Sequence, residues 1–199
     1  MVRNEPDELA RKITETAQAL FHERGIENVS MHQIAKSAGI GQGTLYRRFP
    51  SKSKLCLCLM ESKFERFMRE AESGLLAARE EPVVRRLSAL MTKVIELVYE
   101  DMEWVMAVIA AERLEVAKTN LFELPPFLFL SDQVRRLLEE AADGGESVPL
   151  EPDFAAVVIA SIPRADLLLH LRDRGYSSEQ IADRFCRTFI DPLFGKMQP

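Results

Sequence analysis

Apolar residues recur at helical spacing from the start of the chain. Near the N-terminus, the apolar positions separated by three or four residues are Leu9, Ile13, Ala17, Leu20 and Phe21. This spacing places them on one face of a helix, and Gly25 marks its end because glycine tolerates the left-handed conformation that stops a helix. No stretch alternates convincingly at a period of two, so we expect no β-sheet.

A second helix is predicted to begin after Ser30. Ser30 and Gln33 are spaced as in a capping box, in which each side chain bonds to the backbone amide of the other residue. Ile34 and Ala35 then face inward, and Gly39 ends the helix. The predicted helix is therefore short.

A tight turn and a third short helix follow. The turn is Gly39-Ile40-Gly41, the helix is expected from Gln42 to Phe49, and Pro50 ends it. Two short helices joined by a three-residue turn that contains glycine are typical of the helix-turn-helix, which binds DNA.

The rest of the chain also has helical periodicity. A fourth helix, capped by Ser51, carries apolar residues at Leu57, Met60, Phe64, Phe67, Met68, Ala71 and Leu75. After a break at residues 80–82, we expect helices at 83–102, 103–118, 131–142, 152–174 and 178–194. Pro125-Pro126 and Gly144-Gly145 are expected in loops, and Pro163 should bend its helix because it removes an amide and crowds the preceding turn. The predicted fold is all-α.

Charge is distributed unevenly along the chain. The net charge is −5, but residues 1–56 carry nine Lys and Arg against six Asp and Glu, which is +3 and leaves −8 for the remainder. From Asn28 to Lys54 there is no acidic residue. A local basic patch on an acidic protein indicates a positioned site for an anion such as nucleic acid, not a general affinity.

Cysteine content and hydropathy argue against a disulfide-stabilised protein, a zinc protein and a membrane protein. The three cysteines, Cys56, Cys58 and Cys186, lack the spacing of a disulfide framework or a zinc site, so we expect core residues, no metal and no cofactor. The N-terminus opens with charged residues, and the longest apolar run, Phe154 to Ile162, is about half the length of a membrane span. A cytoplasmic protein with no membrane partner is expected.

The segment from Gly39 to Lys52 resembles the recognition-helix sequence of the tetracycline-repressor (TetR) family. It reads Gly-Ile-Gly-Gln-Gly-Thr-Leu-Tyr-Arg-Arg-Phe-Pro-Ser-Lys. The helix end from Ala17 to Gly25, the Ser30 start and the Ile34-Ala35 pair match the family in order and spacing, so the resemblance covers about residues 8–56. It implies a transcriptional regulator, a repressor that binds a palindromic operator as a homodimer.

The chemistry of the third helix agrees with DNA recognition. Leu45 and Phe49 face the core, which leaves the polar positions for a groove. Glutamine pairs with adenine, threonine offers a methyl group to thymine, and Arg48 and Lys52 suit phosphates. Together with the resemblance, this gives the candidate DNA-contacting residues Ser30, His32, Gln42, Gly43, Thr44, Tyr46, Arg47, Arg48 and Lys52.

Four points qualify these roles. Gly41 stands where the family often has a capping serine, which weakens the helix cap, and Arg47-Arg48 replaces a common His-Tyr or similar pair, which changes the expected DNA sequence. A solvated basic face on an ordinary helical hairpin is the alternative interpretation of the whole patch. For His32, a surface position without a base contact is an equal alternative.

We expect two domains, an N-terminal three-helix helix-turn-helix domain over residues 1–54 and a helical effector-binding and dimerisation domain over residues 55–199. The helix at 152–174 is apolar nearly all round in its first half, so it needs a partner on more than one side. With the last helix it supplies the candidate interface residues Val157, Val158, Ser161, Ala165, Leu168, Ile181, Phe185 and Phe189.

A small-molecule effector is the other expected partner. Methionine and aromatic residues adapt to apolar ligands, and the candidates are Met91, Met102, Trp104, Met106, Val108, Phe122, Phe127 and Phe129. Filling the core is the alternative role of each. We find no catalytic residues, because no nucleophile with a base, phosphate-binding loop or metal cluster has a recognisable spacing. An architectural DNA-binding protein without an effector remains an alternative function.

Overall fold

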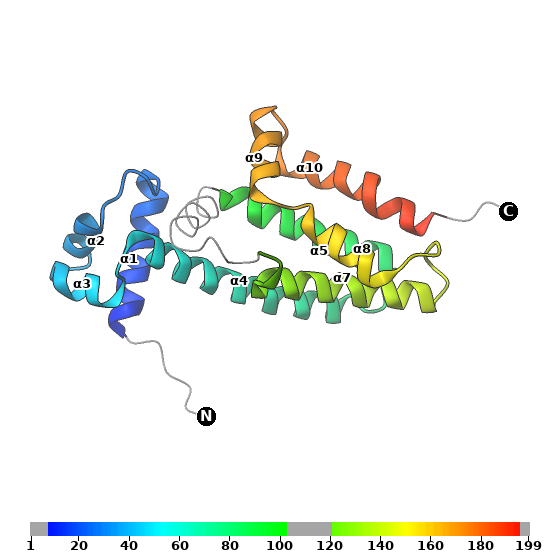
Figure 1. Ribbon diagram of the computed structural model, residues 1–199, viewed down its shortest axis with the longest axis horizontal. Helices are drawn as coiled ribbons and strands as arrows, with labels where there is room; N and C mark the ends of the chain where they lie inside the picture. Colours follow the sequence, from blue (N-terminus) through cyan, green and yellow to red (C-terminus); the bar gives the residue numbers. More distant parts are fainter. Residues whose placement is uncertain (1–7, 103–120, 196–199) are drawn as a thin grey trace, which may run out of the picture. The chain divides into compact units, whose positions relative to one another are not determined.

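The computed structural model describes residues 8–102 and 121–195, and every regular element within them is helical (Figure 1). The protein is all-α, as predicted. The described residues belong to two compact units, and the chain passes from the first to the second between Lys63 and Phe64, within helix α4 (Lys52–Ala77). This boundary lies further along the same helix than the one expected after residue 54. The helix expected at 103–118 lies outside the described residues.

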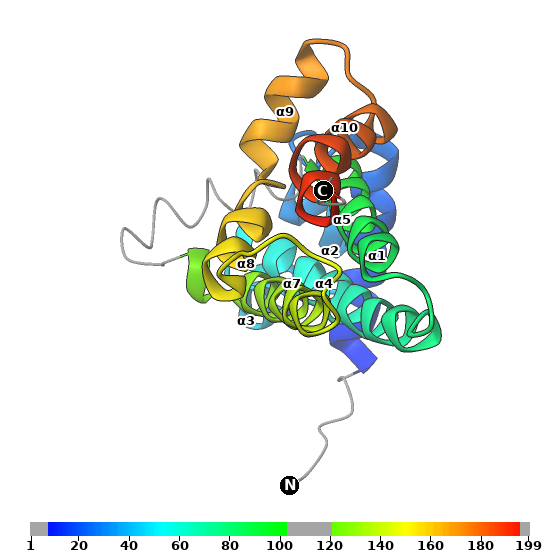
Figure 2. The ribbon, with the colours of Figure 1, turned by 90° about the vertical axis from the view of Figure 1, so that its right-hand side faces the viewer.

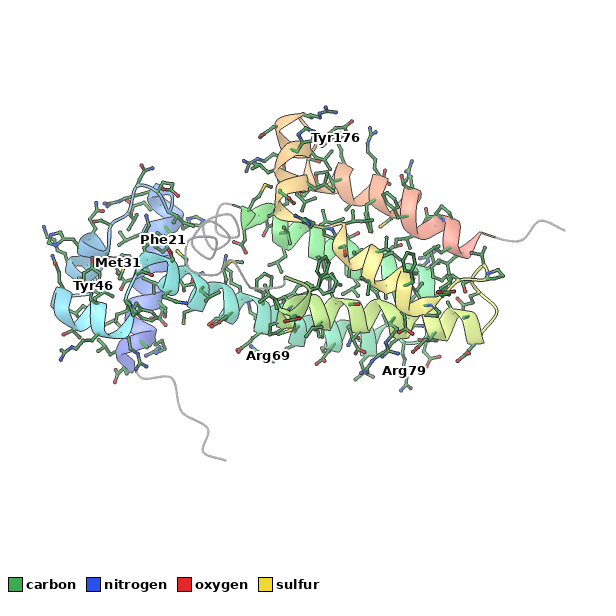
Figure 3. The ribbon with its side chains drawn as sticks, viewed as in Figure 1. Phe21, Met31, Tyr46, Arg69, Arg79 and Tyr176 are labelled. Carbon is green, nitrogen blue, oxygen red and sulfur yellow. The ribbon has the colours of Figure 1, made fainter. Side chains whose placement is uncertain are left out.

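The first unit contains α1 (Glu8–Arg24), α2 (Met31–Ser37), α3 (Gln42–Arg48) and the beginning of α4. Its core is formed by buried apolar side chains from all four helices, including Ile13, Phe21, Met31, Ile34, Leu45, Leu55 and Leu59 (Figure 3). Gly25 and Gly39 have φ of 78° and 65°, where a side chain would be strained, so both helix ends predicted from glycine are confirmed.

The second unit is organised around α5 (Val83–Glu100). This helix contacts α7 (Pro125–Asp143), α9 (Ala165–Asp173) and α10 (Ser178–Phe185), while α7 also packs along α8 (Pro152–Ser161) (Figure 2). Short turns of 3₁₀ helix cover Leu121–Glu123 and Asp191–Phe194, and a π turn covers Cys186–Ile190. One face of α5 is therefore buried along most of its length.

Helix ends in the second unit differ from the sequence-based prediction. The expected loop at Pro125-Pro126 is the first turn of α7, because proline fits a position whose amide has no helical partner. The helix expected at 152–174 is divided into two helices, α8 and α9, and the chain bends by 50° between them. The bend expected at Pro163 is therefore a complete break in the helix. The C-terminal helix loses regular α geometry after Phe185, ahead of Pro192, which lacks the amide needed to continue it.

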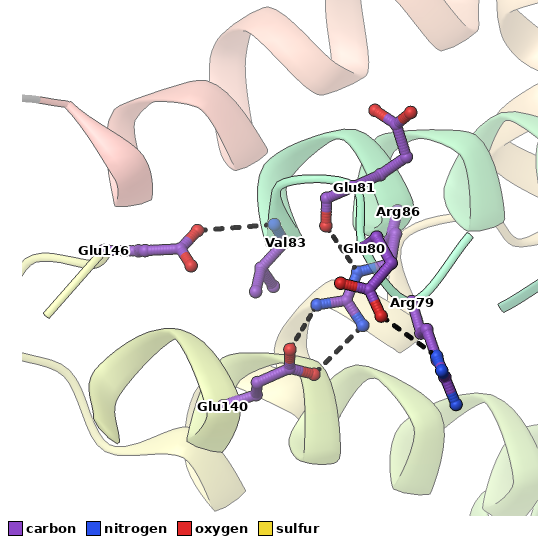
Figure 4. Close-up of polar contacts among 7 residues, drawn as sticks. All are labelled: Arg79, Glu80, Glu81, Val83, Arg86, Glu140 and Glu146. Carbon is purple, nitrogen blue, oxygen red and sulfur yellow. Dashed lines mark hydrogen bonds and ion pairs between the residues drawn. The ribbon is translucent and has the colours of Figure 1, made fainter. Parts of the chain in front are cut away.

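The charged cluster around Arg86 ties three parts of the second unit together (Figure 4). The Arg86 side chain is 7% exposed and forms a two-pronged ion pair with Glu140 of α7, in which Nη1 donates to Oε2 at 3.0 Å. Its Nε donates to the Glu81 carbonyl at 3.0 Å, and the Val83 amide donates to Glu146 Oε2 at 3.3 Å. The turn before α5 is thereby held against α7 and the loop that follows it.

Membrane-spanning length was tested over residues 8–102 and 121–195. No single helix there is long and apolar enough to cross a membrane. The bent pair of α8 and α9 reaches the required length and composition only when its two helices are taken together.

Candidate nucleic-acid interface

Helix α3 has one buried face and one exposed face. Leu45 and Phe49 are buried in the first unit, as predicted. The exposed residues are Gln42, Gly43, Tyr46, Arg47 and Arg48, with Thr44 half-buried beside them. Tyr46 of α3, labelled in Figure 3, is 47% exposed. The exposed face thus presents amide, phenol and guanidinium groups from a stretch without acidic residues.

Hydrogen bonds within α3 orient part of this face. Arg47 Nε donates to the Gly43 carbonyl at 3.3 Å, and its Nη2 donates to Thr44 Oγ1 at 3.4 Å. These contacts hold the Arg47 side chain along the helix, next to Thr44. A side chain held in this way loses less rotational entropy when it meets a phosphate or a base.

Within the described residues, no packing contact requires glycine at position 43. A Cβ atom placed there would meet no heavy atom of the described structure within 4 Å. Glycine within a helix costs roughly 0.5–1 kcal/mol relative to alanine. The missing side chain therefore leaves room on the outer surface of α3, which suits a close approach to another molecule.

The two helices of the helix-turn-helix are linked by their candidate base-contacting residues. Gln42 Nε2 of α3 hydrogen-bonds with His32 Nδ1 of α2, and both side chains are exposed. Sequence reasoning treated these residues separately, because a contact between helices has no signal in residue spacing. Gly41 is the N-cap of α3 and makes no side-chain capping bond, as its residue type requires.

Ser30 has a clear role at the start of α2. Its Oγ accepts from the Gln33 amide at 3.2 Å, and its own amide donates to Gln33 Oε1 at 2.8 Å. The predicted capping box is confirmed. Ser30 is also exposed, so the capped N-terminus of α2 faces solvent.

Lys52 is partly committed inside the first unit. Its Nζ donates to the carbonyls of Ile26 at 2.9 Å and Val29 at 3.2 Å, which lie in the loop between α1 and α2. An ammonium group has three donors, so one remains for a phosphate. The resemblance indicated only the phosphate contact, because the carbonyl partners lie more than twenty residues away in the sequence.

The cysteines offer no metal site in the part of the chain that is described. No group of three or more His, Cys, Asp or Glu side chains is arranged there to hold a metal ion. Burial raises the pKa of the Cys56 thiol to about 11, so at neutral pH it is a protonated core side chain.

Comparison with known proteins agrees with this geometry. Residues 13–57 match the family model of bacterial regulatory proteins, tetR family. Residues 13–57 are therefore similar to the DNA-binding segment of the TetR family. An HTH-type transcriptional regulator of Staphylococcus aureus (strain USA300) is 45% identical over 67 residues, which are 34% of this chain and 36% of that protein. The TetR match thus spans only about a third of that relative's length.

Solved structures resemble the chain over nearly its whole length. The fatty acid degradation regulator FadR from Bacillus halodurans has a TM-score of 0.67 at 20% identity, covering 99% of both chains. Thermus thermophilus FadR, a TetR-family repressor in complex with lauroyl-CoA, has a TM-score of 0.66 at 18% identity, covering 96% of this chain and 97% of its own. At such identities the likeness establishes the shared fold.

The structure separates the candidate dimer residues into two groups. The exposed or half-exposed group is Val157, Val158, Ser161 and Phe189, and the buried group is Ala165, Leu168, Ile181 and Phe185. The buried group packs inside the chain because α9 and α10 contact α5. A partner could touch only the first group directly, together with the exposed Phe154 and Leu167.

The candidate effector residues are described only in part. Three of them lie outside the described residues: Trp104, Met106 and Val108. Met91 and Met102 are buried, Phe127 and Phe129 are half-buried, and Phe122 is exposed. The rings of Phe122 and Phe127 meet edge to face, with centroids 5.0 Å apart. The role of these residues as effector contacts stays a prediction.

Proposed function

We propose that this chain is a TetR-family transcriptional repressor that binds operator DNA through α3 and the N-terminal end of α2. The observation that carries the proposal is the exposed face of α3, where Gln42, Thr44 and Tyr46 lie beside Arg47 and Arg48 with no acid among them. Glutamine and threonine read base edges, whereas arginine and lysine supply phosphate contacts that set register and affinity.

The proposed assembly is a homodimer on a palindromic site. Exposed apolar side chains gather on α8 and after α10, and Val157, Val158 and Phe189 are 45%, 44% and 46% exposed in the single chain. Exposed apolar side chains that form a patch mark interaction surfaces, and we propose that these residues do so. Two-fold protein symmetry then imposes dyad symmetry on the DNA, with half-sites about one helical turn or somewhat more apart.

The proposed effector is a small, largely apolar molecule that binds the second unit and releases the protein from DNA. Support comes from the FadR of Thermus thermophilus, whose similar fold holds lauroyl-CoA. A ligand releases DNA only if it binds the non-DNA arrangement more tightly, and a hundredfold preference corresponds to about 2.7 kcal/mol of coupling. Linkage requires operator DNA to weaken ligand binding by the same factor.

Selection of binding sites from random duplexes tests the DNA assignment. We expect enriched sequences with dyad symmetry, and we expect Gln42→Ala and Thr44→Ala to change the preferred base at particular positions. Arg48→Ala should instead weaken binding to all sequences and reduce the salt dependence. Selected sites without dyad symmetry, or the same effect of all three variants on every site, would contradict the proposal.

Two further measurements test the assembly and the effector. Val158→Asp and Phe189→Asp should yield monomers in sedimentation, whereas Leu76→Asp, at an exposed apolar position of α4, should remain dimeric. Lauroyl-CoA and unesterified fatty acids of several lengths should be titrated with and without operator. Equal ligand affinity in both conditions excludes the ligand as inducer, and an absence of binding across the series favours a DNA-binding protein without an effector.

A further inference from the structure

The contact between α2 and α3 fixes the donor and acceptor groups of one candidate base-reading side chain. Gln42, the first residue of α3, has its Nε2 against Nδ1 of His32, the second residue of α2. An amide nitrogen only donates hydrogen bonds, so Nδ1 accepts and the neutral imidazole carries its proton on Nε2. This one contact therefore determines both the orientation of the amide and the tautomer of the ring.

Local structure holds the two side chains next to each other. The Ser30 capping box fixes the first turn of α2, where His32 lies. The Ile40 amide donates to the Ala35 carbonyl at 3.0 Å, which closes the turn between α2 and α3. A glutamine side chain that is free to rotate loses conformational entropy when it meets a base. The bond to His32 removes part of that cost before DNA is bound.

The bonded arrangement leaves a defined set of polar groups toward solvent. Both side chains are exposed. Gln42 keeps its Oε1 acceptor and its second N–H donor, and His32 keeps its Nε2–H donor. An outward N–H suits the acceptors of DNA, which are phosphate oxygens and base edges, whereas the other tautomer would turn a lone pair toward a polyanion. The tautomer that Gln42 requires is thus also the one that DNA favours.

The adjacent acceptor and donor of Gln42 match one base. Adenine presents its N6 amino donor beside its N7 acceptor in the major groove, and a glutamine amide pairs with both at once. If the amide is turned over, its oxygen and nitrogen exchange places, so donor meets donor and acceptor meets acceptor at adenine. A turned amide makes only a single bond, to an acceptor such as O6 of guanine or O4 of thymine. The orientation of the amide therefore decides the base preference.

We propose that His32 is a positioning residue that fixes the Gln42 amide in the orientation that reads adenine. The inference rests on the proposed operator binding and names a residue that sets its specificity. It assigns one adenine in each half-site to Gln42, and it gives His32 a second role as a donor to DNA. The first role depends on Nδ1 and the second on Nε2, so substitutions can separate them.

The base preference of the full chain at one operator position tests the first role. That position is the one at which Gln42→Ala relaxes the selection, and affinities for adenine and guanine there are compared at one salt concentration and about pH 8, where histidine is ordinarily neutral. We expect the wild type to prefer adenine about tenfold. His32→Ala should reduce the ratio to about threefold or less, because the amide is then free to turn over. Lys36→Ala, at another exposed position of α2, is the matched control and should leave the ratio unchanged.

A conservative variant separates orientation of the amide from a general effect on the helix. In His32→Asn the side-chain oxygen lies as far along the side chain as Nδ1, and it accepts from Gln42 Nε2 in the same way. The variant lacks the outward Nε2–H, so we expect weaker binding to every sequence with the adenine preference retained. A folded His32→Asn protein with a ratio as low as that of His32→Ala would overturn the proposal. Thermal unfolding monitored by circular dichroism verifies that each variant is folded.

Modified bases identify the atoms that Gln42 contacts. 7-Deazaadenine lacks the N7 acceptor, and purine lacks the N6 amino group. Each should weaken wild-type binding about three- to tenfold when it replaces adenine at this position, because one of two hydrogen bonds is lost. Neither base should change the affinity of Gln42→Ala.

Two further results would overturn the proposal. One is an unchanged base ratio in His32→Ala, and the other is a wild-type preference for guanine or thymine at the Gln42 position. Either result leaves operator binding intact, so the proposed function would stand without this inference. If selection yields no preferred sequence at all, the proposed function fails and this inference fails with it.

Discussion

The two units of this chain are built from similar helices, yet they relate differently to other proteins. The family match over residues 13–57 lies in the first unit, which ends at Lys63. Across the whole chain, the solved structures share the fold at 18–20% identity. Both units even use the same device to start a helix, a serine with a glutamine three residues later, at Ser30 and Ser177.

A binding surface and a helical core place different requirements on the amino-acid sequence. A helix that enters a DNA groove needs particular side chains at particular steps, so the first unit is recognisable by its sequence. A helical core needs mainly apolar residues of suitable volume, and many sequences satisfy that condition. The second unit is therefore recognisable by its fold and not by its sequence.

The largest expected effect concerns the buried charge of the second unit. Glu140→Ala should lower the free energy of unfolding by about 2–3 kcal/mol, because the buried Arg86 loses its carboxylate partner. Glu139→Ala is the control on the same helix. Glu139 pairs with the partly exposed Arg135 at 2.7 Å, and such pairs contribute less than about 1 kcal/mol. Urea denaturation followed by circular dichroism measures both, and equal losses would contradict the structural role of Arg86.

The next effect separates stability from DNA contact in the first unit. Lys52→Met should lower the free energy of unfolding by about 1–2 kcal/mol, because the carbonyls of Ile26 and Val29 lose a charged donor. Lys36→Met, at an exposed position of α2, should leave stability nearly unchanged. Thermal unfolding compares the stability of the two variants. The salt dependence of operator binding compares their contacts with DNA. If the two variants had equal stability, the carbonyl contacts would have no structural role.

The two capping boxes allow a direct comparison between the units. Ser30→Ala and Ser177→Ala should each lower the free energy of unfolding by about 1 kcal/mol, since each removes a side-chain bond to a helix amide. Only Ser30→Ala should weaken operator binding, because α2 belongs to the proposed DNA interface. Gel-shift titration of both variants checks this. A comparable loss of DNA affinity in Ser177→Ala would show that the units are not separable in function.

The smallest effect concerns the contact between His32 and Gln42. If His32 orients the Gln42 amide, His32→Ala and Gln42→Ala should be non-additive in operator binding, with a coupling of about 0.5–1 kcal/mol. The measurement is a double-mutant cycle on a single selected operator. Gln42→Ala combined with Lys36→Ala serves as the reference pair and should be additive. Additivity in both pairs would indicate that His32 acts on DNA independently or not at all.

The sequence predicted the features that depend on neighbouring residues. The capping box at Ser30, the left-handed glycines at 25 and 39 and the inward Leu45 all follow from local geometry, and the structure has each of them. They explain why the fold class and the exposed side of α3 could be predicted.

Features that depend on distant contacts could not be predicted in this way. The Lys52 bonds, the Arg86 cluster and the burial of Leu168 each require knowing which helices pack together. Pro125 was misleading because proline favours both loops and the first turn of a helix. The choice between these depends on the burial of later positions such as Leu130 against neighbouring helices.

The Arg86 cluster also has a consequence for behaviour at elevated temperature. The hydration of charged groups becomes less favourable on heating, so the cost of keeping the buried Arg86 guanidinium out of water decreases. Hydrophobic stabilisation per unit area levels off over the same range. The share of stability that this ion pair gives to the junction of α5 and α7 should therefore increase as the protein is warmed. That junction should be among the last parts of the second unit to open before the helices melt.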